Sequence, residues 1–228
     1  MNVLGVVPAR GGSKGIPQKN LRTIAGRPLL AYTADAARAS RLSRTIVSTD
    51  DPAIADVARG LGLEVPFMRP SELATDSAPM APVLQHAVRE MAVRGFTADA
   101  VVLLQPTSPL RRAQHIDRAL DLLVASRADS VVSVVEVPHQ FNPISVMRLD
   151  GDRLMPFIEG PAVLRRQDKP RVYARNGPAV LAVRTSVLER GSLYGEDCRP
   201  LVMAAEESID LDTPLDFDVL DYLLARPR

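Results

Sequence analysis

Cysteine, tryptophan and long apolar runs are scarce or missing in this 228-residue chain. The single cysteine, Cys198, excludes an intrachain disulfide, which favours a reducing compartment. No run approaches the roughly 20 apolar residues that a membrane-spanning helix needs. The apolar start is too short for a signal peptide and leads directly into a polar loop. We therefore expect a cytoplasmic protein without a membrane partner.

An excess of charge of one sign is also missing, since the formal net charge is +1. A surface that follows a nucleic acid needs a clear basic excess, so we expect no nucleic-acid partner. The charges are nevertheless unevenly placed. Five of the first 27 residues are basic and none is acidic: Arg10, Lys14, Lys19, Arg22 and Arg27. This concentration predicts a local anion site near the N-terminus.

The chain length and the rhythm of apolar residues predict one α/β domain, residues 1–228. Strands are expected at residues 3–7, 45–48, 63–67, 101–104, 130–137, 180–183 and 201–203. Helices are expected at residues 28–38, 52–60, 83–91 and 116–124 and at the C-terminal end. This alternation indicates an open, largely parallel sheet with helices on both faces. From about 138 to 175 prolines, glycines and charges interrupt the rhythm, which predicts an excursion from the sheet.

A glycine-rich basic loop, PARGGSKGIPQKN at residues 8–20, follows the first expected strand. Ligands of open α/β sheets bind beyond the carboxyl ends of strands. Glycines allow the backbone to approach an anion closely, and Arg10, Lys14 and Lys19 add charge. A triphosphate is the predicted guest, and a solvated basic turn is the alternative. The loop matches neither the P-loop nor the dinucleotide fingerprint, which argues against oxidoreduction.

An acidic pair, Asp210 and Asp212, precedes the last helix. In an extended segment both carboxylates point to one face, because side chains alternate along a strand. Such a pair suits Mg²⁺ (or Mn²⁺) that also contacts substrate phosphates. The alternative is that Asp212 or Thr213 only caps the helix that begins near Pro214. The basic loop in the same chain makes us favour the metal.

A polar turn follows the expected strand at 101–104. Its side chains Gln105, Thr107 and Ser108 could bind a polyhydroxylated ligand, or the turn could simply end the strand. The three histidines show no metal-ligand spacing and are predicted to be non-catalytic.

Four ordered motifs resemble those of the acylneuraminate cytidylyltransferases, also called CMP-sialic acid synthetases. They are VPARGGSKGI at 7–16 with the following Lys19-Asn20, LQPTSPLR at 104–111, RNG at 175–177 and SIDLDT at 208–213. The resemblance covers nearly the whole chain. It implies a Rossmann-like nucleotidyltransferase fold, CTP as donor and an acidic 2-keto-3-deoxy sugar as acceptor.

The resemblance also implies roles for individual residues. The nucleotide would be bound by Pro8, Ala9, Arg10, Gly11, Gly12, Ser13, Lys14, Lys19, Asn20, Arg69, Asp76 and Ala78. The catalytic groups would be Arg10, Lys14, Lys19 and Asp212. The acceptor would be bound by Gln105, Thr107, Ser108, Arg165, Arg166, Tyr173 and Asn176. The metal would be held by Asp210 and Asp212.

The excursion resembles an arm that builds a homodimer and reaches the partner's active site in similar enzymes. Residues 165–168 and 173–177 look more like the legionaminate branch than the sialate branch, and Ile144-Ser145 stands where sialate enzymes often have a lysine. Other acceptors stay open: Kdo, pseudaminate or a sugar phosphate. A non-catalytic nucleotide-sugar-binding protein is the alternative from a different class.

Overall fold

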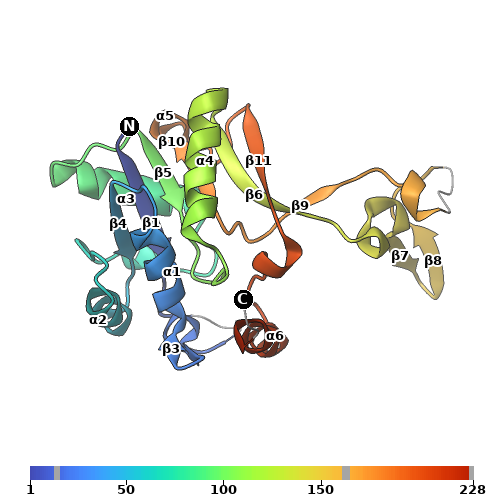
Figure 1. Cartoon of the computed structure of the whole chain (residues 1–228), viewed down its shortest axis with the longest axis horizontal. Coiled ribbons are helices and arrows are strands. Elements are labelled where there is room, and N and C mark those ends of the chain that lie inside the picture. Colours follow the sequence, from blue (N-terminus) through green and yellow to red (C-terminus); the bar gives the residue numbers. More distant parts are fainter. Residues whose placement is uncertain (13–15, 161–164, 226–228) are drawn as a thin grey trace.

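A seven-stranded, mostly parallel β-sheet forms the centre of the fold (Figure 1). The computed structural model describes residues 1–12, 16–160 and 165–225. The strands are β1 (Val3–Pro8), β4 (Arg44–Ser48), β5 (Ala100–Leu103), β6 (Ser130–Glu136), β9 (Tyr173–Arg175), β10 (Leu181–Arg184) and β11 (Cys198–Met203). Their order is β11-β6-β10-β5-β1-β4, and β9 pairs with β6. Only β9 and β10 run antiparallel to their neighbours, so the largely parallel sheet is confirmed.

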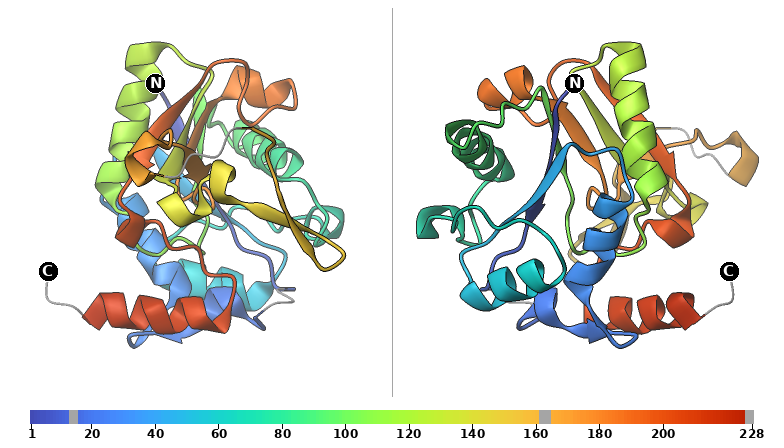
Figure 2. Two further views of the ribbon diagram at one scale, coloured as in Figure 1. Left: turned by 90° about the vertical axis from the view of Figure 1, so that its right-hand side faces the viewer. Right: turned by 60° about the vertical axis from the view of Figure 1, so that its left-hand side comes forward.

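Helices cover both faces of this sheet (Figure 2). They are α1 (Leu29–Arg38), α2 (Pro52–Gly60), α3 (Met80–Val93), α4 (Ala113–Ser126) and α5 (Thr185–Glu189). The last helix, α6 (Pro214–Ala225), packs in a separate apolar cluster. Side chains of β1 alternate between two apolar cores. Val3 and Val7 join the core with α1, α2 and α4, whereas Leu4 and Val6 join the core with α3 and α5. Burial on both faces explains why the strands read as continuous apolar runs.

The segment before α6 is fixed by a cap and by an apolar anchor. The Asp216 carboxylate accepts the backbone N–H of Asp212 at 2.9 Å and of Thr213 at 2.6 Å, as the third residue of a capping box does. Leu211 is buried in a third apolar cluster together with Phe217 of α6. The acidic segment therefore has a defined position in the fold.

The expected strand at 63–67 is wrong. Only an isolated bridge between Ile46 and Glu64 forms there, with the Val47 N–H donating to the Glu64 carbonyl oxygen at 2.8 Å. Pro66 has no N–H to donate, so the ladder cannot continue along this edge. The apolar residues here cover the edge of the sheet instead of extending it.

Between β6 and β9 the chain forms an arm, residues 138–172, that projects from the sheet (Figure 1). Its outer part is the hairpin of β7 (Met147–Asp150) and β8 (Arg153–Pro156). The expected excursion at 138–175 includes Tyr173–Arg175, which the structure places in the sheet as β9. A small hairpin, β2 (Thr23–Ile24) with β3 (Arg27–Pro28), precedes α1. No described helix is long and apolar enough to cross a membrane.

Candidate active site

A polar cavity of about 240 Å³ opens at the carboxyl ends of β1 and β5. This is the edge of the sheet where open α/β folds bind ligands. It brings together residues from three of the motifs, from Pro8 near the N-terminus to Asp212 just before the last helix. Its lining is Pro8, Arg10, Lys19, Asn20, Arg69, Met80, Gln105, Pro106, Thr107, Asp210 and Asp212.

The described part of the glycine-rich loop is held by a hydrogen bond within the loop and by another to the residues that follow β4. The Asn20 side-chain amide donates to the Arg10 carbonyl oxygen at 3.1 Å, and the Gly11 N–H donates to Asp50 Oδ1 at 3.2 Å. A Cβ on Gly11 would lie 2.5 Å from Asp51 Oδ2, so only glycine fits there. The loop backbone thus passes directly against the N-terminus of α2.

Parts of the loop prediction fall outside these contacts. Ser13 and Lys14 lie outside the described residues, and their roles stay predictions. Gly12 has open space around its Cα, so the fold itself does not require glycine there. Ala9 is buried, and its N–H continues the sheet pairing to the Ser48 carbonyl oxygen at 3.0 Å.

The cavity's cations pair with nearby carboxylates. Arg10 forms an ion pair with Asp76, which links residue 76 to the cavity although it does not line it. Lys19 Nζ lies 3.2 Å from Asp212 Oδ1 and also donates to the Leu211 carbonyl oxygen. The Asp212 carboxylate therefore faces Lys19, while the Asp216 carboxylate accepts the backbone N–H groups at the start of α6.

Asp210 differs from Asp212 in its surroundings. Its Oδ1 atom is buried and has no hydrogen-bond partner among the described residues. Burial raises the pKa of the Asp210 carboxyl, and the nearby Thr107 side chain acts against it; the charge of Asp212 raises this pKa further, while Lys19 lowers it. A buried, unpartnered carboxylate oxygen at the wall of a polar cavity fits a ligand for a hard cation.

A metal here would depend on substrate oxygens as well as protein. The described residues contain no group of three or more histidine, cysteine, aspartate or glutamate side chains that could hold an ion. Asp210 and Asp212 supply two carboxylates on one cavity wall. That number suits Mg²⁺, which is usually bound by one or two carboxylates plus phosphates and water.

Arg69 forms the floor of the cavity next to β4. The side chain is 6% exposed, and its Nε donates to Ser48 Oγ at 3.0 Å while another guanidinium nitrogen donates to the Ser48 carbonyl oxygen. Burial lowers the pKa of Arg69 to about 10, partly offset by Asp50, so the group is charged at neutral pH. Ala78, predicted beside it, does not line the cavity.

The polar turn after β5 lines the cavity next to the acidic segment, since the Leu211 N–H donates to the Thr107 carbonyl oxygen at 3.0 Å. Gln105 Nε2 donates to the Gly177 carbonyl oxygen at 2.8 Å. The hydroxyl oxygens of Thr107 and Ser108 are buried without a partner among the described residues. A Cβ on Gly177 would lie 3.1 Å from Ser108 Oγ and 3.3 Å from Asp210 Cγ, so this glycine allows close packing. Ser108 thus lies behind the wall, whereas Gln105 and Thr107 line it.

Asn176 is buried and its amide is already engaged. Its Oδ1 accepts from Ser133 Oγ at 2.6 Å, and its Nδ2 donates to Ser208 Oγ at 2.9 Å. These bonds join β6 to the turn that leads to Asp210. The observed contacts give Asn176 a supporting place behind the site and leave its predicted contact with an acceptor untested.

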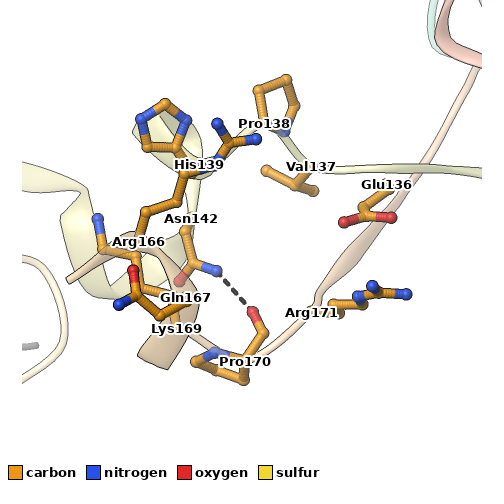
Figure 3. A pocket seen from close by; sticks show the side chains of 10 residues that line it. All are labelled: Glu136, Val137, Pro138, His139, Asn142, Arg166, Gln167, Lys169, Pro170 and Arg171. Atoms are coloured by element: carbon orange, nitrogen blue, oxygen red, sulfur yellow. Dashed lines mark hydrogen bonds between the residues drawn. The ribbon is translucent and has the colours of Figure 1, made fainter.

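Arg165, Arg166 and Tyr173 do not line the cavity of their own chain, and the arm projects away from the sheet (Figure 1). Arg165 Nε pairs with Asp168 at 2.8 Å, and Tyr173 is exposed on β9. Arg166 lines a different hollow of about 520 Å³ at the base of the arm, shown in Figure 3. Other charged or titratable side chains around this hollow are Glu136, His139, Lys169 and Arg171.

Three contributors to the site were missed from sequence. Met80 lines the cavity because α3 begins at Met80, three residues before the expected start. Asp50 anchors the loop and Arg111 supports the turn after β5, each through contacts with residues far away in the sequence. The run Asp50-Asp51-Pro52 after a strand was the available signal for Asp50.

Comparisons with known proteins point to one family. The cytidylyltransferase family model matches residues 4–175. The CMP-N,N'-diacetyllegionaminic acid synthase of Legionella pneumophila is 36% identical, with 98% of this chain and 97% of that protein covered. An N-acylneuraminate cytidylyltransferase of Streptococcus agalactiae is 33% identical over 95% of this chain, which spans 52% of that longer protein.

A solved structure supports the fold. The structure of CMP:2-keto-3-deoxy-manno-octonic acid synthetase complexed with CTP has a TM-score of 0.73 and 20% identity, and 99% of each chain is covered. At that identity the likeness shows a shared fold, which confirms the expected nucleotidyltransferase architecture. The family model and the full-length relative show more: the chain belongs to the cytidylyltransferase family, as its resemblance to the acylneuraminate cytidylyltransferases implied.

Proposed function

We propose that this enzyme activates a nonulosonic, sialic-acid-like sugar with CTP and releases the CMP-sugar and pyrophosphate. One observation supports this most strongly. A single cavity at the carboxyl edge of the sheet holds three cations (Arg10, Lys19 and Arg69), two carboxylates and the Gln105 amide. Cations suit a triphosphate, and the amide suits a polyhydroxylated acceptor. The relatives named for legionaminic and neuraminic acids, the first of them matched over its full length, suggest the acceptor class.

In the proposed reaction the anomeric hydroxyl oxygen of the acceptor attacks the α-phosphorus of CTP. A new P–O bond forms, the bond to pyrophosphate breaks, and the hydroxyl proton is released. Arg10, Lys14 and Lys19 hold the triphosphate and offset the charge that develops on its oxygens. Gln105 and Thr107 orient the acceptor in the same cavity, so catalysis is positioning together with charge stabilisation.

Asp210 and Asp212 would hold Mg²⁺ in this proposal. The buried, unpartnered Oδ1 of Asp210 supports the assignment, as does the exposure of Asp212 at the cavity. When bound, the ion would neutralise charge on the phosphates. Asp212 would then exchange its contact with Lys19 for the metal, which leaves the Lys19 ammonium available to a phosphate oxygen.

We further propose a cytoplasmic homodimer built through the arm, with Arg165 or Arg166 reaching the acceptor carboxylate in the partner's site. Large apolar side chains on the arm are exposed in the single chain, among them Leu149 at 75% and Leu154 at 65%. Such a surface favours burial against another protein surface. The distance of Arg165 and Arg166 from the cavity of their own chain is consistent with use across an interface.

A pyrophosphate-release assay tests the function. CTP, ATP, GTP and UTP are compared with a panel of nine-carbon and eight-carbon keto acids as acceptors. We expect CTP to be strongly preferred and a nine-carbon acid such as legionaminate to be turned over. Comparable kcat/KM with another nucleotide, or turnover restricted to Kdo or a sugar phosphate, would contradict the proposal.

A further inference from the structure

Arg111 is a buried cation at the end of the LQPTSPLR motif, outside the cavity lining. It is 3% exposed. One guanidinium nitrogen donates to the carbonyl oxygens of Gln105 at 2.9 Å and Ala179 at 2.8 Å, and the other donates to Thr33 Oγ1 at 2.7 Å. The guanidinium therefore joins the turn after β5, the segment before β10 and helix α1.

This cation has no carboxylate within ion-pair distance in the described part of the chain, unlike Arg10 or Lys19. Burial alone lowers the pKa of Arg111 to about 9, so it is charged at neutral pH. A buried charge without a counterion costs stability unless its hydrogen bonds offset that cost. Merely ending a strand needs only a turn of ordinary composition. The buried guanidinium of Arg111 therefore stands at a turn that could end the strand without any charge.

The contacts of Arg111 form a closed ring with the acceptor wall. Arg111 binds the Gln105 and Ala179 carbonyl oxygens, and the Gln105 side chain donates back to the Gly177 carbonyl oxygen. A Cβ added at Gly177 would lie 3.3 Å from Asp210 Cγ, so this turn passes close to the acidic segment. Gln105, which lines the cavity, is therefore positioned through a ring that Arg111 closes, and Asp210 lies beside that ring.

We propose that Arg111 is a positioning residue for the acceptor, acting through Gln105 and the turn at 177–179. The inference rests on the proposed function, because it assigns Gln105 to the acceptor. Without the guanidinium the Gln105 backbone and the turn lose their common donor. The side chain that meets the acceptor then shifts, while the loop that meets CTP keeps its own contacts with Asp50 and Asn20.

Arg184 offers a matched control. Like Arg111, it donates to two backbone carbonyl oxygens, those of Ala128 at 2.8 Å and Leu123 at 3.1 Å, although Arg184 is only partly buried. It pairs with Ala100, the first residue of β5, so it lies at the edge of the sheet opposite the cavity. Arg184→Met therefore removes a comparable guanidinium without touching the acceptor wall.

The experiment compares Arg111→Met, Arg111→Lys and Arg184→Met with the wild-type chain. The measurements are urea stability, CTP affinity by titration, and kcat and KM for the acceptor. Both methionine variants should lose stability, but only Arg111→Met should lose about tenfold or more in kcat/KM for the acceptor. Its CTP affinity should stay within about twofold of wild type, and Arg111→Lys, which keeps a cationic donor, should restore part of the loss.

A double-mutant cycle gives an independent check on the folded Arg111→Lys variant. If Arg111 acts through Gln105, the effects of Arg111→Lys and Gln105→Ala on acceptor kcat/KM should be clearly less than additive. Additive effects, or an Arg111→Met variant no worse than Arg184→Met, would overturn this inference alone. A wild-type chain that turns over no keto acid with CTP would overturn the proposed function, and the inference with it.

Discussion

The cavity at the sheet edge and the hollow at the base of the arm both gather charged side chains, but they are built differently. In the cavity, Arg69 and Asn20 are buried and bound to backbone atoms of other elements. In the arm, the Arg165 side chain is 72% exposed and pairs with Asp168, three residues away. The fold therefore sets the geometry of the cavity in advance, while among the described residues the exposed Arg165 is held by a pair with a close neighbour in sequence.

This difference predicts where substitutions act. Cavity side chains should affect turnover strongly, because catalysis depends on groups held in place before the substrate arrives. Arm side chains should have smaller effects that depend on assembly. The predictions below follow that order, from the largest expected effect to the smallest.

Asp212→Asn should have the largest effect. Losing one of the two proposed metal ligands should lower Mg²⁺-dependent kcat/KM by orders of magnitude. Stability without metal should hardly change, because the pair with Lys19 has a largely exposed carboxylate and such pairs contribute little. Mg²⁺ titrations of activity and thermal midpoints in a chelating buffer provide the measurement. Wild-type-like turnover in both Asp212→Asn and Asp210→Asn would refute the metal assignment.

The control is Asp216→Ala, four residues further on. Its carboxylate caps α6 and does not line the cavity. It should cost about 1 kcal/mol of stability, as loss of a helix cap does, with little change in kcat/KM. Asp212→Asn should therefore lower kcat/KM and spare stability, whereas Asp216→Ala should lower stability and spare kcat/KM. The same outcome in both variants would contradict the separate roles assigned to the two aspartates.

Lys19→Ala should come second. Charge-assisted hydrogen bonds to a triphosphate contribute roughly 1.5–3 kcal/mol each, so kcat/KM should fall about tenfold to hundredfold. Arg22→Ala is the matched control, because Arg22 lies over the Phe217 ring at 4.2 Å and does not line the cavity. Steady-state kinetics with CTP varied provide the measurement. A folded Lys19→Ala enzyme with wild-type kcat/KM would show that the loop does not bind phosphates.

Arg166→Ala tests the arm. If the residue reaches the acceptor carboxylate of the partner subunit, the acceptor KM should rise roughly tenfold while the KM for CTP stays the same. Arg153→Ala, on the outer hairpin, should leave both unchanged. Light scattering at assay concentration should show a dimer. A fully active monomer would rule out a contribution of the arm to the partner subunit's site.

The sequence predicted most of the sheet and every described α-helix except the short α5, because apolar spacing reports burial directly. It could not predict that β10 runs antiparallel between β5 and β6, since a strand buried on both faces has the same composition in either direction. The strand expected at 63–67 failed at Pro66, where one missing donor outweighs apolar composition. Local pattern therefore predicts the elements better than their pairing.

The candidate site shows the same division. The loop and the acidic pair were visible as clusters of charge, and the structure places both at one cavity. The supports behind them were not visible. Arg111 reaches Ala179 across 68 positions, and Gly11 reaches Asp50 across 39. Nothing in the local composition of these residues distinguishes a support from an ordinary surface charge.

His115 on α4 contacts Glu207, which lies just before the acidic segment. Its titration should have the smallest effect on stability among these predictions. The ring is buried, and Nδ1 accepts the Arg112 N–H, so Nε2 carries the hydrogen and donates to Glu207 Oε2 at 3.2 Å. Burial lowers the pKa of His115 below its usual 6.5, against the raising effect of Glu207, and Arg112 and Arg118 act in the same direction as burial. The folded ring therefore stays neutral at a pH where the unfolded one binds a proton. Because the unfolded state binds more protons below about pH 6.5, stability should fall as the pH drops from 7 toward 5.

Glutamine can accept and donate at the same two places without titrating, so His115→Gln should weaken this pH dependence while changing stability little at pH 7.5. Urea unfolding of both proteins between pH 5 and 7.5 measures the difference. A wild-type chain that gains stability relative to His115→Gln on acidification would mean that the pair with Glu207 outweighs burial.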